Sequence, residues 1–544
     1  MKVFVAQLNP TVGDLDNNTA KVLAALERAR KATADIVLFS ELVLCGYPPE
    51  DLLFYPSFIS AMEEKLEKIK PHTKGLFVAL GLARKNPEGK EKGAFNSAAV
   101  LCDGELLGFK DKTLLPTYDV FDERRYFEPG KMQKVFSYKG KKIAVIICED
   151  MWEHGGGVIF TKYRRDPILE LQPERPDLLL NLSASPYYFQ KRDFRVEIFA
   201  PCTKTLKCPL IFCNQVGGND QLVFDGYSLY MNEKGELLKS AKGFVEEDMI
   251  IDLASSYKPI AFPYDAYDDL YSALVLGVKD YFQKQGFTKA LVGLSGGIDS
   301  ALVACIAVKA LGKDNVLCLA MPSRYSADQS YNDALKLTKN LGVKLEKISI
   351  DSLFQSFLEE LEPHFKNKPA DITEENLQSR IRGMILMAFS NKFGHIVLST
   401  GNKSEMAMGY ATLYGDMCGG LGVLNDVTKM QIYALCKHIN LKKEIIPDSI
   451  IKRIPTAELR PNQKDTDSLP EYPIVDTVLE EYVENLKTAE EISKKHGIDL
   501  SLVQDLIKRI HNAEYKRRQA PPGIRVTKRA FSKGRMFPIV QRWK

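Results

Sequence analysis

The hydrophobic and polar positions of this chain follow two periods along most of its length. Short apolar, β-branched runs typical of buried strands alternate with stretches in which apolar residues recur every three or four positions, as in amphipathic helices. The first half predicts strands at residues 3–8, 35–39, 75–82, 143–148, 178–182 and 209–214, and helices at 18–31 and 58–70. Such alternation fits an α/β layered sandwich.

Turn-forming residues subdivide this pattern. Asp103-Gly104 and Lys234-Gly235 each stand between β-prone runs and predict two hairpins, at residues 98–109 and 227–238. The periodicity then lapses in a stretch rich in Ser and Pro. We therefore predict a first domain at residues 1–254, a linker at 255–265 and a second domain at 266–544.

The second half has the βαβα order of a doubly wound, Rossmann-like parallel sheet. Strands are predicted at residues 290–294, 316–321, 344–350 and 396–400, and helices at 266–285, 301–308, 326–341 and 381–392. In such folds ligands bind at the carboxyl ends of the strands.

Composition narrows the functional classes. The 544 residues are enough for roughly two to four domains. A net charge of +4 argues against a general nucleic-acid or membrane-surface binder. No apolar run is long enough to span a membrane, and the chain starts directly with a predicted strand, so no secretory signal is expected. The ten cysteines form no CxxC pair. We expect a cytoplasmic protein with neither disulfides nor structural zinc.

The stretch LVGLSGGIDS at residues 291–300 links a strand to a helix start through a glycine turn. Gly296 and Gly297 let the backbone approach an anion closely, and the free N–H groups of the helix end favour negative charge. Asp299 would repel phosphate unless a cation stood between them, so we expect Mg²⁺ there. An ordinary glycine-rich βα turn remains an alternative.

SGGIDS resembles the pyrophosphate loop of the N-type ATP pyrophosphatases, which split ATP into AMP and pyrophosphate. The resemblance implies an ATP site. A second glycine turn, STGNKSE, carries Glu405, which could pair with Asp299 across the metal or serve as a helix N-terminal charge. The implied ATP-binding residues are Gly293, Leu294, Ser295, Gly296, Gly297, Ile298, Asp299, Ser300 and Thr400.

Reactive residues follow predicted strands in the first half. Glu41 lies in FSELVLCGYPPEDLL, Lys112 in GFKDKTLLPTYDVFDERRYFEPG and Cys148 in ICEDMW. Taken singly, each has a common structural explanation, since cysteine is usually a small core residue and carboxylates and lysines are usually solvated. Together, in this order, they resemble the nitrilase, or carbon-nitrogen hydrolase, superfamily.

This resemblance implies a nitrilase-like αββα sandwich and a hydrolytic site. Glu41 would be the general base, Cys148 the nucleophile that forms a thioester, and Lys112 the group that stabilises the oxyanion. Glu123 is the candidate for a further glutamate beside the nucleophile. The residues implied to bind the amino-acid end of glutamine are Tyr118, Ser185 and Lys191, although Ser185 has a structural alternative as a cap or turn residue.

Three later segments resemble the NAD synthetases, namely STGNKSEMAMGYATLYGDMCGG, RIPTAELRPNQKDTDSLPEY and HNAEYKRRQAPPG. With the nitrilase-like half, the resemblance is to the glutamine-using members and implies ATP-dependent amidation of deamido-NAD with nitrogen from L-glutamine. Asn376, Glu405 and Lys516 would contact deamido-NAD. Arg453 stands where some ammonia-using relatives have lysine, which leaves its role open. Homo-oligomers and a shielded ammonia route are also expected.

Other functions stay open at this stage. The segment 516–544 is rich in Lys and Arg, lacks acids and carries interspersed aromatics, a composition that also suits RNA. A tRNA-modifying ATP pyrophosphatase or another glutamine amidotransferase would use a different acceptor. A scaffold with inactive domains would lack glutaminase activity. Because ATP and a dinucleotide also carry phosphates, we expect no nucleic-acid partner and no membrane contact.

Overall fold

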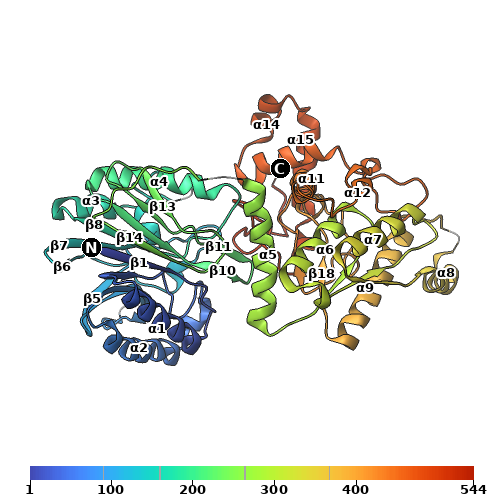
Figure 1. The fold of residues 1–544 in the computed structure, drawn as a ribbon. Helices are drawn as coiled ribbons and strands as arrows, with labels where there is room; N and C mark the ends of the chain where they lie inside the picture. The colour runs from blue at the N-terminus through green and yellow to red at the C-terminus, as the bar shows by residue number, and fades with distance from the viewer. Residues whose placement is uncertain (90, 158–160, 263–264, 367, 544) are drawn as a thin grey trace. The chain divides into compact units, whose positions relative to one another are not determined.

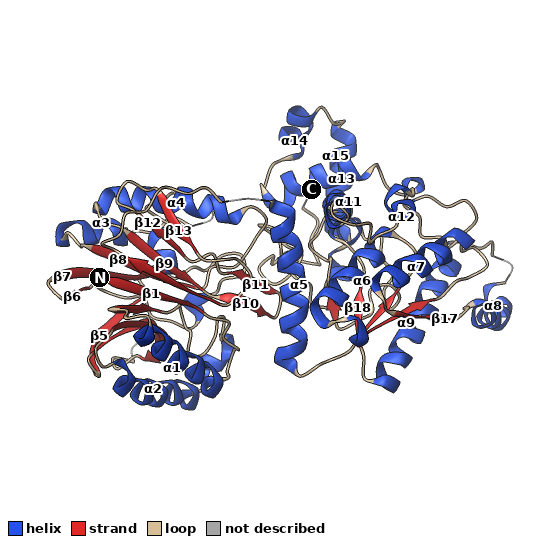
Figure 2. Cartoon of the chain, in the orientation of Figure 1, coloured by secondary structure: helices blue, strands red, loops and turns tan. Residues whose placement is uncertain are grey.

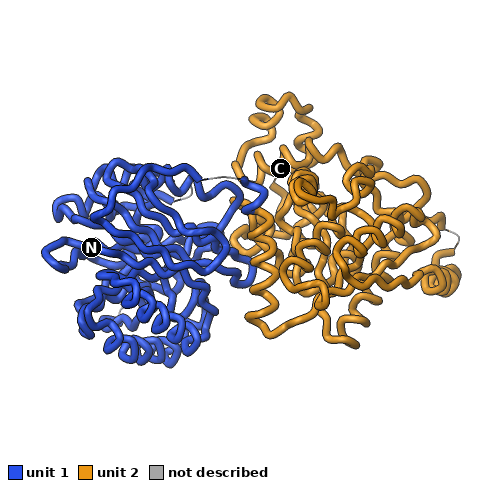
Figure 3. Tube along the Cα trace, in the orientation of Figure 1, with its two compact units in different colours: residues 1–269 blue, residues 270–544 orange. Residues whose placement is uncertain are grey.

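The computed structural model describes residues 1–89, 91–157, 161–262, 265–366 and 368–543. By its internal contacts the chain divides into two units, Met1–Asp269 and Leu270–Lys544 (Figure 3). The division falls in the first turn of helix α5 (Ala266–Gln285), next to the predicted linker, whose Pro263 and Tyr264 lie outside the described residues. No described helix is both long and apolar enough to cross a bilayer.

Two six-stranded mixed sheets form the first unit (Figures 1 and 2). One sheet has the order β14-β1-β2-β3-β4-β5, with β1 (Lys2–Gln7), β2 (Ile36–Leu38), β3 (Phe77–Lys85), β4 (Ala94–Cys102), β5 (Glu105–Asp111) and β14 (Glu247–Asp252). The other has the order β13-β12-β9-β8-β7-β6, with β6 (Val135–Tyr138), β7 (Lys141–Ile147), β8 (Leu178–Ser183), β9 (Leu210–Asn214), β12 (Leu229–Met231) and β13 (Leu237–Ser240). The strands β10 (Val216–Asn219) and β11 (Leu222–Asp225) pair separately.

The apolar faces of the two sheets pack on each other. Val5 and Phe77 from one sheet meet Val145 and Leu180 from the other in one buried cluster. Helices cover the outer faces, with α1 (Leu15–Lys31) and α2 (Pro56–Ile69) on one side and α3 (Pro167–Leu171) and α4 (Lys191–Leu206) on the other (Figure 1). The predicted αββα sandwich is confirmed, and the two predicted hairpins are β4–β5 and β12–β13.

A five-stranded parallel sheet of order β17-β16-β15-β18-β19 forms the centre of the second unit. Its strands are β15 (Ala290–Gly293), β16 (Val316–Ala320), β17 (Lys344–Lys347), β18 (Ile396–Ser399) and β19 (Leu421–Gly422). The chain moves outward from β15 to β17 and then resumes at β18 on the other side of β15. This reversal is the place where doubly wound sheets bind ligands, and the predicted fold class is confirmed.

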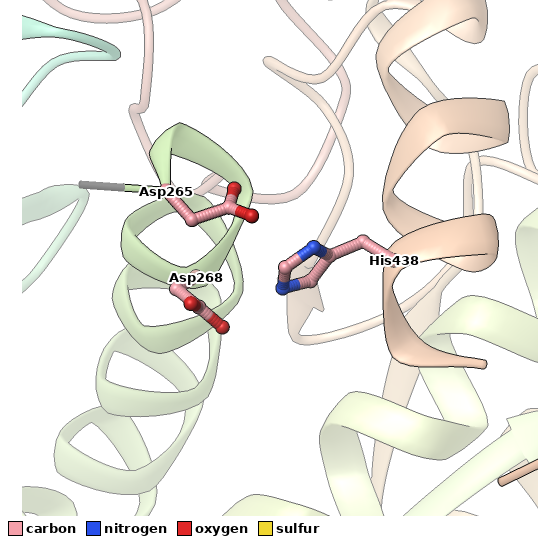
Figure 4. Close-up of side chains that lie close together, drawn as sticks. All are labelled: Asp265, Asp268 and His438. Atoms are coloured by element: carbon pink, nitrogen blue, oxygen red, sulfur yellow. The ribbon is translucent and has the colours of Figure 1, made fainter. Parts of the chain in front are cut away.

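Helices surround this sheet and continue into a C-terminal helical region. Their bounds are α6 (Ile298–Leu311), α7 (Asp328–Leu341), α8 (Asp351–Phe365), α9 (Ile372–Phe393), α10 (Lys403–Met408), α11 (Lys429–Ile439), α12 (Asp448–Lys452), α13 (Tyr472–Leu479), α14 (Ala489–His496), α15 (Leu500–Asn512) and α16 (Glu514–Arg517). Figure 4 shows Asp265 and Asp268 at the start of α5, and His438 on α11. Since these residues belong to different units, we infer no metal site from them.

Helix α9 is longer than its hydrophobic pattern predicts. It begins at Ile372 rather than at residue 381, so Asn376 lies inside the helix and not ahead of it. Asp371 caps the helix by accepting the N–H of Thr373, and the Glu374 side chain accepts the N–H of Asp371 in return. This capping box satisfies the free donors of the first turn and explains the early start.

Candidate active sites

The structure brings Glu41, Lys112 and Glu123 into direct contact in the first unit. Glu41 follows strand β2 and Lys112 follows β5, whereas Glu123 lies in a short 3₁₀ helix. The Lys112 Nζ lies 2.7 Å from Glu41 Oε1 and 2.7 Å from Glu123 Oε1. All three side chains are buried. Three of the four predicted catalytic residues therefore form one hydrogen-bonded cluster.

Cys148 directly follows strand β7, and the charges of Glu41 and Lys112 act on its thiol. Burial raises the pKa of its thiol, the negative charge of Glu41 raises it further, and Lys112 opposes the increase. The residue has a left-handed backbone conformation, with φ of 40°. Its N–H donates to Asn181 Oδ1 at 3.2 Å. The thiol is held neutral next to a carboxylate that can accept its proton.

Neighbouring groups hold the Glu41 carboxylate on both of its oxygens. Asn96 Nδ2 donates to Oε1 at 2.7 Å, and the Ala184 N–H donates to Oε2 at 3.0 Å. Burial alone would lower the pKa of Lys112, but the carboxylates of Glu123 and Glu41 outweigh it and hold that pKa well above its ordinary value. Lys112 is therefore a permanent cation between two acids. Sequence reasoning missed Asn96, which carries no motif of its own.

Glu123 differs from Glu41 in its surroundings. The Tyr47 hydroxyl donates to Glu123 Oε1 at 2.8 Å, whereas Oε2 is buried and lacks a hydrogen-bond partner. Burial raises the pKa of the Glu123 carboxyl, and the Lys112 ammonium only partly offsets this increase. Glu123 thus holds a proton more readily than an exposed glutamate.

The three predicted glutamine-binding residues come from different segments of the first unit. The Tyr118 hydroxyl donates to Glu149 Oε1 at 2.8 Å. Ser185 lies in the loop after β8, where its N–H donates to Asn214 Oδ1 at 2.8 Å, and it is not a helix cap. The Lys191 Nζ donates to the Pro186 carbonyl at 2.7 Å.

Glu149 was missed by sequence reasoning although it directly follows Cys148. It is buried and also accepts a hydrogen bond from the Tyr163 hydroxyl at 3.1 Å. Burial raises the pKa of its carboxyl, while the charges of Lys112 and Lys191 oppose the rise. The acid is therefore near both the nucleophile and the predicted substrate-binding residues.

A cavity of about 320 Å³ opens at the carboxyl ends of strands β15, β16 and β18 in the second unit. The predicted ATP-binding residues that line it are Gly293, Leu294, Ser295, Gly297, Ile298, Asp299, Ser300 and Thr400. Gly296 does not line the cavity. Its φ of +83° and the approach of the Ser330 carbonyl, 2.3 Å from where a Cβ would stand, show that it turns the loop against helix α7.

Asp299 and Glu405 face the same cation. The Lys429 Nζ lies 2.5 Å from Asp299 Oδ2 and 3.6 Å from Glu405 Oε1, and Asn402 Nδ2 donates to Asp299 Oδ1 at 2.9 Å. Burial and the charge of Asp299 raise the pKa of Glu405. The other oxygen of Glu405, Oε2, accepts the Asn402 N–H at 3.3 Å, so Glu405 also has the helix N-terminal role at the start of α10. Carboxylate oxygens are the ligands Mg²⁺ prefers, and both acids line the cavity, so the pair fits the predicted metal in its chemistry. Lys429, which carries no recognisable motif, was missed.

The predicted deamido-NAD residues differ in whether they line this cavity. Glu405 lines the cavity, whereas Asn376 and Lys516 do not. Lys516 Nζ donates to the carbonyls of Gly409 and Ala411 at 2.8 and 2.7 Å, and burial lowers its pKa. Asn376 Oδ1 accepts the Thr412 hydroxyl at 2.8 Å. Both residues hold the segment 409–412, part of which lines the cavity.

Arg453 links the cavity to helix α7. Its Nη1 donates to Ser330 Oγ at 2.6 Å, and its guanidinium also pairs with the buried Asp333. Ser330 is the residue against which Gly296 packs. Arg453, whose role the sequence left open, therefore contacts the residue on which the loop at residues 293–300 packs.

The basic C-terminal segment is partly used inside the second unit. The guanidinium groups of Arg517 and Arg535 each lie 2.8 Å from Glu514 Oε2, and both stack over Phe531. These two arginines are buried. Their charges serve folding, which weakens the case for an RNA-binding strip.

Two family models together match nearly the whole chain and define its class. Carbon-nitrogen hydrolase matches residues 2–257, and NAD synthase matches residues 270–520. The chain is 45% identical over 552 residues to the glutamine-dependent NAD(+) synthetase of Synechocystis sp., covering 99% of this chain and 98% of that protein. It is 42% identical over 550 residues to the glutamine-dependent NAD(+) synthetase of Acinetobacter baylyi, covering 100% and 99%.

Solved structures agree over the full length. The glutamine-dependent NAD+ synthetase of Acinetobacter baumannii, solved in complex with ADP, matches with a TM-score of 0.79 and 39% identity, covering 100% of this chain and 99% of that one. The enzyme of Cytophaga hutchinsonii matches in fold, with a TM-score of 0.84 and 20% identity, covering 99% and 98%. The chain belongs to the glutamine-dependent NAD(+) synthetase family, as its motifs predict.

Proposed function

We propose that this chain converts deamido-NAD to NAD, using ATP and the amide nitrogen of L-glutamine and releasing AMP, pyrophosphate and glutamate. The observation that carries the proposal is the buried Glu41–Lys112–Glu123 cluster beside the Cys148 thiol. Residues 1–254 would form the glutaminase domain, 255–265 a linker and 266–544 the synthetase domain.

In the first half-reaction Glu41 takes the thiol proton as Cys148 attacks the side-chain carbonyl of glutamine. The Lys112 ammonium stabilises the developing oxyanion. As the tetrahedral intermediate collapses, the C–N bond breaks and the nitrogen leaves as ammonia with the proton held by Glu41. Water then attacks the thioester, releases glutamate and restores the thiol. Glu123 accepts a second hydrogen bond from the Lys112 ammonium and so helps to keep it in place.

The amino-acid end of glutamine carries an ammonium and a carboxylate. Glu149 is the buried acid suited to the ammonium, because Tyr118 and Tyr163 already orient one of its oxygens. Lys191 supplies the opposite charge for the carboxylate, and Ser185 a hydroxyl beside it. This arrangement favours an amino acid over a simple amide.

In the second half-reaction the nicotinate carboxylate of deamido-NAD attacks the α-phosphorus of ATP. The resulting acyl adenylate is then attacked by ammonia, and AMP leaves. The loop at residues 293–300 and Thr400 would hold ATP, while Asn376 and Lys516 would contact deamido-NAD near the segment 409–412. Asp299 and Glu405 would hold Mg²⁺, which would neutralise charge on the departing pyrophosphate. Lys429 keeps a fixed positive charge beside this carboxylate pair.

We also propose a homo-oligomer and a cytoplasmic location. Helix α9 exposes Met384 and Met387, one turn apart on the same face, by 59% and 38%, and a second copy would cover them. All ten cysteines are free thiols, as expected of a reducing compartment. A Met384→Glu substitution should lower the mass measured by light scattering, and an unchanged mass would argue against this interface.

The experiment that tests the proposed function is Cys148→Ala in the full chain. Release of glutamate should cease, whereas NAD formation from added ammonium salts should continue, because only the first unit has lost its nucleophile. Cys213→Ala, a buried cysteine on β9 outside the catalytic cluster, is the matched control and should retain both activities. Loss of both activities in Cys148→Ala would contradict the proposed division of labour.

A further inference from the structure

Asp150 is a buried carboxylate that contacts the segment carrying Lys112. Its side chain has no exposed surface. Oδ1 accepts the backbone N–H groups of Thr113 and Leu114, both at 2.9 Å. These two residues directly follow Lys112, so Asp150 holds the backbone from which the ammonium extends.

The other oxygen of Asp150 contacts the segment carrying the nucleophile. Oδ2 accepts the N–H of Ile147 at 3.2 Å, one residue before Cys148. The same oxygen lies 3.3 Å from the Lys110 Nζ, whose side chain is also fully buried. One carboxylate thus holds both the backbone after Lys112 and the backbone before Cys148.

Lys110 completes this arrangement. It neutralises the buried charge of Asp150, and its Nζ donates to Thr113 Oγ1 at 2.9 Å. Three backbone N–H groups therefore donate to the Asp150 carboxylate, and the Lys110 ammonium pairs with its charge. Because its side chain has no exposed surface and both of its oxygens are already engaged, Asp150 is not available to bind substrate.

The reaction depends on the geometry that these contacts maintain. Cys148 has a left-handed φ of 40°, a conformation that is unfavourable in a non-glycine residue and persists only when its surroundings hold it. The Lys112 ammonium must also lie where the oxyanion forms after Cys148 attacks. A residue bonded to both backbone segments is suited to set that separation.

We propose that Asp150 is a positioning residue that fixes Lys112 relative to Cys148 and thereby sets the rate of glutamine hydrolysis. The inference rests on the proposed function of the first unit. It assigns the Lys110–Asp150 pair a role in catalytic rate rather than in glutamine affinity.

Asp150→Asn tests the inference in the full chain. The substitution keeps the shape but turns one acceptor into a donor, which must face either the N–H groups of Thr113 and Leu114 or the N–H of Ile147. We expect kcat for glutamine hydrolysis to fall about 100-fold, the cost of a shift of roughly 1 Å in a catalytic group. KM for glutamine should stay within about twofold, and ammonia-dependent NAD formation should be unchanged.

Asp177→Asn is the matched control. Asp177 accepts the Lys142 N–H at 2.8 Å and a hydrogen bond from the Lys141 Nζ at 2.9 Å. Like Asp150, it is a carboxylate that contacts a lysine and a backbone donor, but at the opposite end of strand β7. This control should keep its kcat. If Asp150→Asn kept kcat within about threefold, or if both variants lost kcat equally, the inference would be overturned.

A second variant covers the case in which Asp150→Asn fails to fold. Lys110→Met combined with Asp150→Asn leaves no unpaired buried lysine, and the inference expects the same fall in kcat with KM unchanged. A rise in KM with normal kcat would overturn it. Absence of glutaminase activity in the unsubstituted chain would overturn the proposed function itself, and this inference with it, so the two failures are distinguishable.

Discussion

Replacing Lys112 by methionine separates the catalytic role of the cluster from its role in stability. Methionine keeps the length of the side chain but removes the ammonium. Glu41 and Glu123, each now 2.7 Å from the Lys112 Nζ, would lose their shared cation. The substitution should therefore impair both glutamine hydrolysis and folding of the first unit, for two different reasons.

The expected magnitudes follow from the contacts. Loss of one oxyanion donor costs about 10²–10³-fold in kcat. Removing one partner of a buried ion pair costs about 3–5 kcal/mol. Glu123 can take up a proton in the variant, and this limits the loss of stability. Protonating a carboxyl with an ordinary pKa of 4.5 costs about 3 kcal/mol at pH 7. For a unit of this size we expect the melting temperature to fall by about 6–20 °C.

Glutamate release and thermal unfolding would be measured on Lys112→Met and on the same variant with Glu123→Gln added. The second substitution removes one of the two stranded charges, so it should recover much of the stability and none of the activity. The stability loss in Lys112→Met should also shrink as the pH falls toward 4.5, where the carboxyl protonates at little cost. Glutaminase activity within about tenfold of the unsubstituted chain would refute the role given to Lys112.

Two further predictions concern the second unit. Gly296→Ala should abolish ammonia-dependent NAD formation and spare glutaminase activity. Residue 296 has a φ of +83°, and a Cβ there would stand 2.3 Å from the Ser330 carbonyl. Retention of NAD formation would show that the loop tolerates displacement. Burial and the charge of Asp299 raise the pKa of Glu405 in the folded state, so its contribution to stability is full below pH 4.5 and is lost as the pH rises. Glu405→Gln should therefore raise the melting temperature of the second unit at pH 8 and leave it unchanged near pH 4.5. If the variant and the unsubstituted chain melted at the same temperature at both pH values, this linkage would be contradicted.

The family and the fold class could be predicted because they depend on local patterns. Strand ends followed by Glu41, Lys112 and Cys148, and a glycine turn before Asp299, are legible within short windows of sequence. Helix α9 was misplaced at its start because its apolar residues are spread around the helix, so periodicity carried less information than the capping box at Asp371.

Other site features could not be predicted because they depend on contacts between distant segments. Lys429 is 130 residues from Asp299 in sequence, yet its ammonium lies between the two predicted metal-binding acids. Asn376 and Lys516 lie outside the cavity lining and contact the neighbouring segment 409–412. No local pattern indicates which charged residue will face which other one.

The sequence by itself determined the order of strands and helices, the glycine turn of the nucleotide site and the identities of the reactive residues, since each depends on neighbours within a few positions. Only the tertiary structure decided how these residues are charged and held. Burial raises the pKa of the Cys148 thiol and of the Glu123 carboxyl, and Asp150 joins two catalytic segments, because folding removes water and brings together groups that are far apart along the chain.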